Sequence, residues 1–276
     1  MPELPEVHTL LEELKNEKII GQSIIKANVY WPRSIAIPTV EEFSKIILNK
    51  KILGLSRRGK YLIINLNDNY DLMIHLRMSG RLILSTNEPE ELTYIRLSLI
   101  LNDSRQLNFH DTRKFGRCYL VKSNSNFFEK LGPEPLDSTF TPSLLQKMLQ
   151  KKSRGLKPLL LDQSFIAGLG NIYVDEALWD AKLHPLRKSN TLSKNEVTQL
   201  HTSIQHVLNR GLQSGGTTLG TGRSNFYRLS GEKGNHQSLL KVFRQTGKEC
   251  PRCNHIIERI KVAQRSTHIC RNCQKI

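Results

Sequence analysis

Acidic residues are scarce in this sequence. Of its 276 residues, 25 are Asp or Glu and 41 are Lys or Arg, so the formal net charge is +16 at pH 7. An excess of this size indicates a polyanionic partner, because Lys and Arg that meet phosphates supply the sequence-independent part of nucleic-acid binding. The composition by itself does not separate a DNA enzyme from an RNA-binding or ribosomal protein.

Long apolar segments and dispersed cysteines are missing as well. No segment approaches the roughly 18 consecutive apolar residues of a membrane span, and residues 1–6 lack the basic and apolar regions of a signal peptide. Four of the five cysteines lie in the last 27 residues, an arrangement that favours a metal over a disulfide framework. We therefore expect a cytoplasmic protein without a membrane partner.

The residues that are present suffice for packed domains. Hydrophobic residues make up 38% of the chain, and a chain of this length commonly forms about two domains. A helix near the N-terminus is predicted by apolar residues that recur on one face, at Val7, Leu10, Leu11 and Leu14. Apolar stretches between Asn, Asp and Gly turns predict strands at 61–66, 72–78, 92–101, 107–110 and 115–121. We predict that this half forms a β-sandwich with flanking helices.

A break at residues 131–135 separates this half from a helical one. Thr141 is placed to cap a helix that begins at Pro142. A later helix is predicted from its apolar face at Val197, Leu200, Ile204, Val207 and Leu208. Residues 213–238 hold six of the 17 glycines and are predicted to form a long functional loop. The chain is therefore predicted to be an α+β protein of three domains, at residues 1–133, 134–239 and 240–276.

Two Cys-x2-Cys pairs give the most specific local signal. Cys250 and Cys253 are followed, after 16 intervening residues, by Cys270 and Cys273. This spacing suits two hairpins whose four thiolates form a tetrahedral site around one Zn2+. Four sulfur ligands leave no open coordination position, so we predict that the zinc stabilises the fold and performs no chemistry. Cys118 is predicted to be a small core residue.

Basic residues concentrate around these cysteines. Residues 241–276 contain nine Lys or Arg and two acidic residues, and a small zinc-stabilised module of this charge is typical of a nucleic-acid contact. The segments 45–60 and 147–157 contain several Lys and Arg and no acidic residue. We expect all three regions to face one phosphate backbone.

Pro2 is a candidate nucleophile. A small second residue permits removal of Met1, which leaves a secondary amine at the start of the chain. An α-amino group has a pKa of about 8, so at physiological pH a neutral fraction exists that can attack an electrophilic sugar carbon. Glu3 and Glu6 could act as acid or base beside it, although the helix dipole equally explains carboxylates in a first helical turn. A Met-Pro start is also common for reasons of N-terminal stability alone.

Seven motifs occur in order along nearly the whole chain. They are Met1-Pro2-Glu3-Leu4-Pro5-Glu6-Val7, Ser56-Arg57-Arg58-Gly59-Lys60-Tyr61, His75-Leu76-Arg77-Met78-Ser79-Gly80, Asp111-Thr112-Arg113-Lys114-Phe115-Gly116, Leu131-Gly132-Pro133-Glu134-Pro135, Ala167-Gly168-Leu169-Gly170-Asn171-Ile172-Tyr173 and the terminal cysteine module. Together they resemble the bacterial formamidopyrimidine-DNA glycosylase family, also called Fpg or MutM. The resemblance implies an N-terminal β-sandwich, a helix-two-turns-helix domain and a zinc finger, with duplex DNA bound in the cleft between the domains.

The resemblance also implies an activity and its residues. It implies a base-excision repair enzyme that removes oxidised purines, 8-oxoguanine and formamidopyrimidines, and cleaves the strand by β,δ-elimination. Pro2 corresponds to the nucleophile at C1′, and Glu3 to its acid/base partner at the sugar. Lys60 corresponds to a phosphate-contacting proton donor for β-elimination, and Arg265 to a contributor to δ-elimination.

Further positions correspond to DNA contacts of the family. A lesion base must be extruded from the duplex, and the vacated space must be filled. The void-filling residues that the resemblance implies are Met78, Arg113 and Phe115. Met78 is flexible enough to fill an irregular gap, Arg113 can donate hydrogen bonds to the orphaned base, and Phe115 can insert between base steps. Contacts to phosphates or to the lesion are implied for His75, Lys152, Lys157 and Asn171.

The residues taken singly leave simpler interpretations open. Met78 continues an alternation that starts at Leu72, which by itself predicts the core of a strand. Phe115 alone would also be a core residue. His75 alone would be a structural strand histidine, and the glycines before Asn171 alone would be a plain turn.

Three departures from the family pattern bear on substrate preference. His8 stands where the family usually has a glutamate in the lesion pocket, and Leu92-Thr93-Tyr94 replaces a frequent His-Asp-His segment. The loop at 217–237, which in the family closes over the flipped base, also diverges in sequence.

Two alternatives are therefore kept. The first is an endonuclease VIII-like glycosylase that prefers oxidised pyrimidines, and the second is a non-catalytic zinc-containing DNA-binding protein. Pro5-Glu6-Val7 and Arg113-Lys114-Phe115 favour the Fpg branch, and the complete set of catalytic candidates argues against a silent binder. We expect a monomer that acts at the nucleoid in a bacterial cytoplasm.

Overall fold

The computed structural model describes residues 1–86, 92–220, 222 and 225–276. It contains two compact units, of which the first comprises residues 1–128 with 214–237 and the second residues 129–213 with 238–276. The glycine-rich loop therefore groups with the N-terminal unit, and residues 221, 223 and 224 of this loop lie outside the described part. The division into three domains at 133 and 239 stays a prediction.

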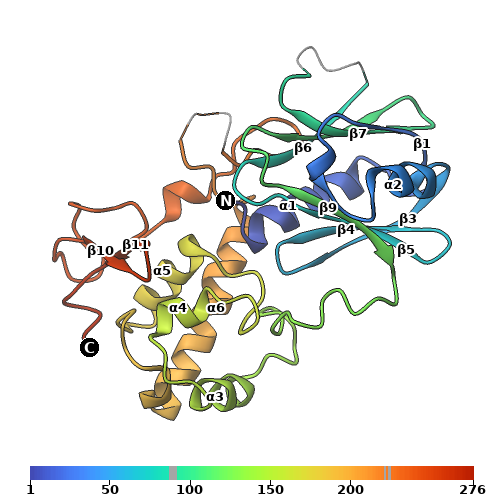
Figure 1. The fold of residues 1–276 in the computed structure, drawn as a ribbon. Helices are drawn as coiled ribbons and strands as arrows, with labels where there is room; N and C mark the ends of the chain where they lie inside the picture. The colour runs from blue at the N-terminus through green and yellow to red at the C-terminus, as the bar shows by residue number, and fades with distance from the viewer. Residues whose placement is uncertain (87–91, 221, 223–224) are drawn as a thin grey trace. The chain divides into compact units, whose positions relative to one another are not determined.

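The first unit begins with helix α1 (Leu4–Asn16; Figure 1). Glu3 and Glu6 form a capping box, in which each side chain accepts a hydrogen bond from the backbone N–H of the other residue. Such a box satisfies two N–H groups that a helix start leaves without an intrahelical partner. The predicted apolar face is confirmed, because the following residues are buried: Val7, Leu10, Leu11 and Leu14.

A single sheet in the first unit folds into two layers. Its strands are β1 (Ser23–Val29), β2 (Ile35–Ile37), β3 (Lys50–Arg58), β4 (Tyr61–Leu66), β5 (Tyr70–His75), β6 (Gly80–Ser85), β7 (Ile95–Leu101), β8 (Gln106–Asp111) and β9 (Arg117–Lys122). Their order is β2-β9-β5-β4-β3-β1-β7-β8-β6. β1 and β3 pair only at Ser23↔Lys51 and Ile24↔Lys50, so the sheet can bend sharply there. A short 3-10 helix η1 (Pro32–Ser34) and helix α2 (Val40–Ile47) complete this part.

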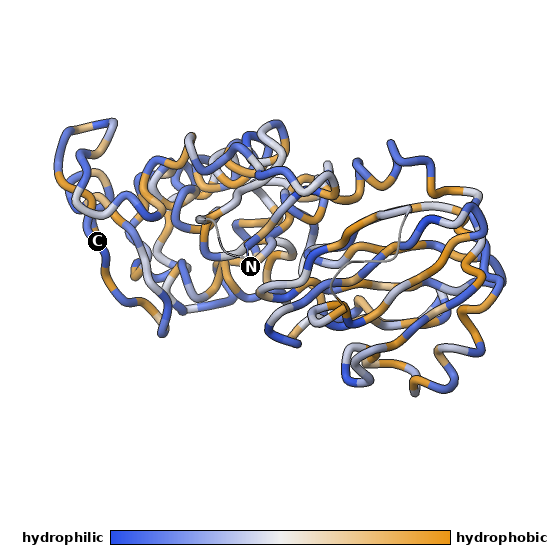
Figure 2. Tube along the Cα trace, turned by 90° about the horizontal axis from the view of Figure 1, so that it is seen from above, coloured by the Kyte–Doolittle hydropathy of each residue, from blue (hydrophilic) through white to orange (hydrophobic). Residues whose placement is uncertain are grey.

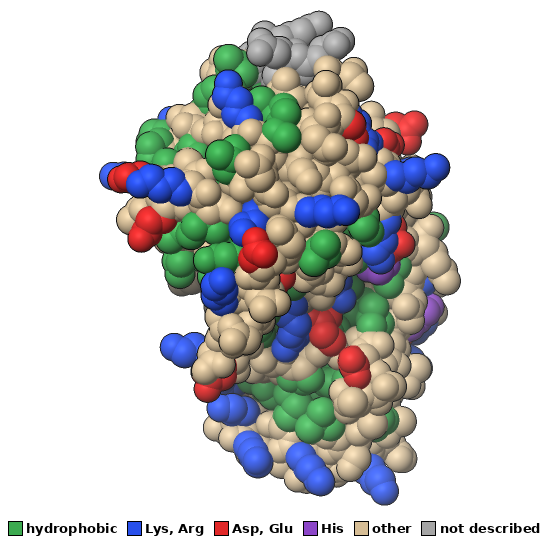
Figure 3. Space-filling view, turned by 90° about the vertical axis from the view of Figure 1, so that its right-hand side faces the viewer, with side chains coloured by type: hydrophobic (Ala, Val, Ile, Leu, Met, Phe, Trp, Pro, Cys, Tyr) green, Lys and Arg blue, Asp and Glu red, His purple; other side chains and the backbone are tan. Residues whose placement is uncertain are grey.

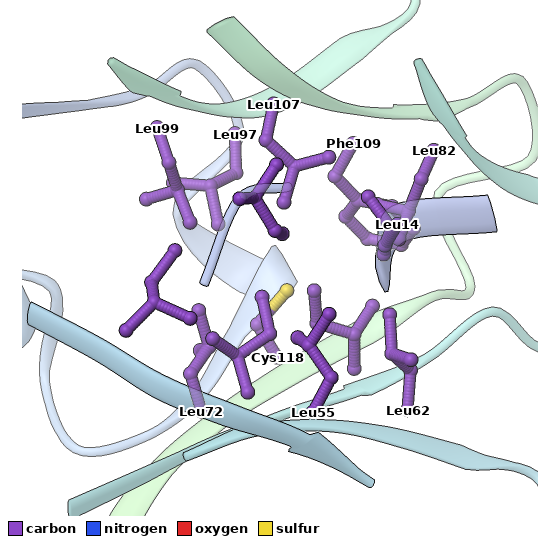
Figure 4. Packing of buried hydrophobic residues seen from close by; sticks show 14 of the residues in the cluster. Leu14, Leu55, Leu62, Leu72, Leu82, Leu97, Leu99, Leu107, Phe109 and Cys118 are labelled. Atoms are coloured by element: carbon purple, nitrogen blue, oxygen red, sulfur yellow. The ribbon is translucent and has the colours of Figure 1, made fainter. Parts of the chain in front are cut away.

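The core lies between the two layers. Figure 4 shows leucines of β7 and β8 facing leucines of β3, β4 and β5, with Cys118 among them. Figure 2 shows the alternation behind this packing, since hydrophobic and hydrophilic residues follow one another along the strands. Each fully buried leucine contributes about 2 kcal/mol relative to an exposed one. The predicted sandwich and the predicted core position of Cys118 are both confirmed.

The second unit is mainly helical. Its helices are α3 (Pro142–Gln150), α4 (Leu156–Leu160), α5 (Asn171–Asp180), α6 (Lys194–Gln213) and the 3-10 turns η2 (Ser189–Thr191) and η3 (His236–Leu239), the last of which straddles the division between the units. The Thr141 hydroxyl accepts a hydrogen bond from Leu144 N at 3.2 Å, which confirms the predicted cap of α3. The predicted apolar face of α6 is also buried. Strands β10 (Glu258–Val262) and β11 (Arg265–Ile269) form a hairpin near the C-terminus.

No helix in the described residues has the length and apolar character needed to cross a membrane.

Candidate active site and metal centre

The start of the chain is fixed by buried carboxylates. The Glu6 side chain accepts one hydrogen bond from Glu3 N at 2.7 Å and another from Thr217 N at 2.8 Å. Pro2, Glu3 and Glu6 are buried, whereas Met1 is 51% exposed. Removal of the exposed Met1 would therefore leave the new terminal amine on the buried Pro2, directly before Glu3 in the chain, without disturbing the core. The contact between Glu6 and the glycine-rich loop was not predicted from the sequence.

Lys60 is the second residue of the two-residue turn that joins β3 to β4. Gly59 in this turn has φ +55°, and its carbonyl accepts a hydrogen bond from Arg57 Nη1 at 2.8 Å. Helix α1 packs against β3 and β4. Burial lowers the pKa of His8 on α1, and the charge of Arg57 lowers it further. Helix α1 and strand β3 are thus neighbours, and the buried Lys60 lies in the turn that directly follows β3.

His75 is a neutral hydrogen-bond donor. Its Nδ1 accepts a hydrogen bond from Arg77 N at 3.0 Å, so Nε2 carries the ring hydrogen. Burial, together with the positive charges of Arg77 and Lys60, lowers the pKa of His75 to about 3. The His75 ring also packs edge-on against Tyr61, with 4.6 Å between ring centroids. A neutral Nε2–H of this kind suits a phosphate oxygen.

We expect the His75 ring to stay neutral between about pH 5 and 8. Because its folded-state pKa of about 3 lies below the unfolded value of about 6.5, His75 contributes stability in full above that unfolded pKa. This contribution is lost as the pH falls toward the folded pKa. The measurement is the pH titration of imidazole NMR signals, with His75→Asn used to assign the resonance. A His75 midpoint near 6 would contradict the prediction.

Met78, Arg113 and Phe115 are exposed tips of two loops. Strand β5 ends at His75, so the strand predicted at 72–78 stops early and Met78 leaves the alternation. Met78 is 41% exposed and Phe115 is 46% exposed, so neither is a core residue. Arg113 Cζ lies 4.9 Å from the centroid of the Phe115 ring. An apolar wedge beside a cation fits insertion into a base stack.

Three candidate DNA contacts lie in the second unit and differ in exposure. Lys152 is exposed after α3. Asn171 begins α5 and donates from Nδ2 to Ser266 O at 3.1 Å. Lys157 is fully buried, and its ammonium group contacts Asp175 Oδ1 at 2.5 Å and donates to Ser266 O at 2.9 Å. The structure thus gives Lys157 an interior ion pair, and its predicted DNA contact stays a prediction.

The four predicted zinc ligands come together. The Sγ atoms of Cys250, Cys253, Cys270 and Cys273 all lie within 4.8 Å of one another. A tetrahedral site with Zn–S bonds of about 2.3 Å requires sulfur separations of about 3.8 Å, and the separation between Cys250 and Cys273 is 3.9 Å. These residues fit one structural Zn2+. Trp179 Nε1 on α5 donates to Cys250 Sγ at 3.3 Å, a second contact that orients the ligand.

Arg265 is presented by the hairpin that this centre stabilises. Ala263 and Gln264 form its two-residue turn, and both have positive φ, at 46° and 62°, as a type I′ turn requires. Asp175 Oδ2 accepts from His268 N at 2.9 Å, so α5 holds β11 three residues beyond Arg265. Asp175 and Trp179 were not predicted as supporting residues, because the zinc-finger residues that they contact, His268 and Cys250, lie 93 and 71 positions away.

Basic side chains are spread over one face of the molecule. Figure 3 shows Lys and Arg at many places on this face, with Asp and Glu between some of them. The wide distribution agrees with the net charge of +16 and with an extended polyanion as the ligand.

Three family models match successive parts of the chain. The formamidopyrimidine-DNA glycosylase N-terminal domain matches residues 1–118, the formamidopyrimidine-DNA glycosylase H2TH domain matches 131–222, and the zinc finger found in FPG and IleRS matches 247–276. A formamidopyrimidine-DNA glycosylase of Protochlamydia amoebophila is 52% identical over 275 residues and is covered completely, as is this chain. One from Pelotomaculum thermopropionicum is 42% identical over 280 residues, again with complete coverage of both.

Solved structures agree with these matches over the whole chain. A Lactococcus lactis Fpg variant bound to Fapy-dG DNA has a TM-score of 0.92 and 39% identity, with 100% of both chains covered. The Lactococcus lactis Fpg complex with abasic-site DNA has a TM-score of 0.91 and 39% identity, with 99% of this chain and 100% of that chain covered. A MutM complex with DNA that contains carbocyclic 8-oxo-G also has a TM-score of 0.91 at 39% identity, with full coverage.

Proposed function

The chain belongs to the formamidopyrimidine-DNA glycosylase family, and from this premise we propose that it excises oxidised purines from duplex DNA through an iminium intermediate at Pro2. The assignment as a DNA glycosylase and AP lyase is supported by relatives and solved structures that match this chain over its full length. The substrates are 8-oxoguanine and formamidopyrimidines in duplex DNA. We further propose a monomer in the bacterial cytoplasm, acting on the nucleoid.

The buried N-terminal residues support the roles proposed for the sugar chemistry. The neutral Pro2 amine attacks C1′ and the damaged base leaves, with Glu3 moving protons at the sugar. The iminium makes the hydrogens on C2′ acidic, so elimination breaks the strand on the 3′ side. Lys60 supplies a proton and contacts the phosphate, and Arg265 assists the second elimination. The capping box of α1 holds the Glu3 carboxylate at a fixed position, one residue after the Pro2 amine in the chain.

The proposed DNA contacts follow from the donor chemistry of three residues. His75 offers a neutral donor to a phosphate, and Lys152 offers an exposed cation. Asn171 stands at the N-terminus of α5, where backbone N–H groups also favour an anion. Lys157 supports the Arg265 hairpin through Ser266, in addition to any contact with DNA.

The function is tested by trapping with borohydride. Purified protein is incubated with duplexes that carry 8-oxoguanine, a formamidopyrimidine or an oxidised pyrimidine, and a covalent adduct is sought on a denaturing gel. We expect adducts with all cleavable substrates and the highest rates for the two purine lesions. Faster reaction with the pyrimidine would instead support the endonuclease VIII-like alternative, which His8 keeps open. DNA binding without any adduct would support a silent binder.

Phe115→Ala is expected to slow excision from duplex DNA by about tenfold to a hundredfold, because unstacking a base step costs a few kcal/mol that the wedge offsets. A pre-formed abasic site needs less extrusion, so its cleavage should fall less. Both rates and the melting temperature are measured on one preparation. A large drop in melting temperature with equal loss on both substrates would show that Phe115 is a structural residue.

A further inference from the structure

One buried carboxylate joins the two loops that carry Met78, Arg113 and Phe115. Asp111 Oδ1 accepts hydrogen bonds from Ser79 Oγ at 2.5 Å and from Arg113 N at 3.1 Å, and its Oδ2 accepts from Gly116 N at 2.7 Å. Ser79 Oγ also accepts from Arg113 N at 3.2 Å. Asp111 has no exposed surface, and Ser79 is 1% exposed. The loops 76–79 and 112–116 are therefore tied together beneath their exposed tips.

The Phe109 ring forms a common floor for both loops. A Cβ added to Gly116 would lie 2.3 Å from this ring, and one added to Gly80 would lie 2.9 Å from it and 2.4 Å from Leu76 O. Neither position accepts a side chain without a shift of backbone or ring. Both loops thus rest directly on the same aromatic side chain, close enough for the single Asp111 carboxylate to bridge them.

Each loop also holds a left-handed residue directly before a tip. Arg77, before Met78, has φ +54°, and Lys114, before Phe115, has φ +60°. Residues with a Cβ adopt this region only where surrounding contacts favour it. For Lys114 such a contact is the Trp31 ring, whose centroid lies 4.2 Å from Nζ. The Asp111 carboxylate supplies hydrogen bonds on the other side, at Arg113 N and Gly116 N.

We propose that Asp111 and Ser79 are positioning residues that lock the loops 76–79 and 112–116 into one preformed wedge. The proposal rests on the proposed function, since it concerns how the void-filling residues enter the duplex. Two loops that moved independently would each lose conformational freedom on entering the base stack. Ordering them beforehand removes that cost from the extrusion step. Arg96 Nε donates to the Asp111 carbonyl at 2.8 Å and brings a positive charge to the buried carboxylate.

The test compares Ser79→Ala with Ser98→Ala. Ser98 is an equally buried serine in the same sandwich, and its hydroxyl donates to Asn108 Oδ1 between β7 and β8, away from both loops. Each variant loses one buried hydroxyl, so we expect similar changes in melting temperature. Ser79→Ala is expected to slow single-turnover excision of 8-oxoguanine from duplex DNA about tenfold, since its hydroxyl bonds a carboxylate. Cleavage of a pre-formed abasic site should change less than about threefold, because that site needs less extrusion.

A second readout follows wedge entry without chemistry. A duplex that carries a non-cleavable abasic analogue opposite 2-aminopurine should fluoresce more strongly as the wild-type protein unstacks that base. We expect a slower or smaller rise for Ser79→Ala, a larger defect for Asp111→Asn, and a wild-type response for Ser98→Ala. Wild-type cleavage of abasic DNA separately tests the proposed function. The proposal that Asp111 and Ser79 lock the two loops would be overturned by either of two results. One is a wild-type fluorescence rise in Ser79→Ala, and the other is an equal loss of 8-oxoguanine excision and abasic-site cleavage, as a destabilised protein would show.

Discussion

A protein with a blocked or extended N-terminus is expected to lose strand cleavage by roughly a thousandfold or more, because the nucleophile of a covalent mechanism is removed. Pro2 lies buried at the start of α1, while the half-exposed Met1 projects from it. Any residue retained before Pro2 turns the amine into an amide that cannot form an iminium. The readouts are cleavage of abasic duplex DNA and borohydride trapping.

Two controls distinguish the loss of the N-terminal amine from a general loss of structure. Pro2→Gly keeps an N-terminal amine and should retain more activity than the blocked protein, with mass spectrometry showing that Met1 is absent. DNA binding by the blocked protein should remain, since the candidate phosphate contacts at His75, Lys152 and Asn171 are unchanged. Wild-type cleavage by a protein that still carries an N-terminal extension would show that Pro2 is not the nucleophile.

The sequence correctly predicted those elements that are determined by a pattern of a few neighbouring residues. The spacing of Val7, Leu10 and Leu14 predicted α1, and Thr141 predicted the start of α3. The strand predicted at 61–66 coincides with β4. The cysteine spacing predicted four sulfurs that the structure brings within 4.8 Å of one another. Each of these signals depends on periodicity or on short-range ligand geometry.

The end of β5 shows where periodicity fails. Leu72, Ile74 and Leu76 alternate, and Met78 continues the pattern, yet the strand ends at His75. The cause is not a local propensity but the left-handed turn at Arg77 and the hydrogen bond from Ser79 to Asp111, 32 positions along the chain. Such a contact has no signature at either residue. The family resemblance predicted a DNA-facing Met78, whereas the alternation of apolar residues predicted a buried one.

Buried charges were the least predictable part of the site. Lys157 lies in an acid-free segment and was therefore expected on the surface, but Asp175 on α5 pairs with it in the interior. Glu6 was a candidate acid or base, and the structure adds a bond to the backbone of Thr217. In both cases the partner is brought close only by the tertiary fold. A single sequence therefore gives the identity of the charged residue but not its environment.

Removal of zinc is expected to unfold the hairpin that carries Arg265. Binding free energy in all-cysteine sites of small modules is of the order of 10 kcal/mol and is at the same time folding free energy. Chelation or Cys253→Ser should therefore release β10 and β11, whose pairing spans only five residue pairs. Trp179, which donates to Cys250 Sγ, reports this event by fluorescence in a Trp31→Phe background.

The activity of the zinc-free protein should change in two ways. DNA binding should weaken by at least about a hundredfold and become less dependent on salt, because nine Lys or Arg in residues 241–276 no longer meet phosphates in a fixed arrangement. At saturating abasic DNA, the Pro2 adduct and the product of β-elimination should still form, while the δ-elimination product should decline, since Arg265 is no longer positioned. Arg265→Ala with zinc bound should reproduce the change in products without the change in Trp179 fluorescence. A zinc-free protein that gave wild-type proportions of both products would exclude the hairpin, and Arg265 with it, from the reaction.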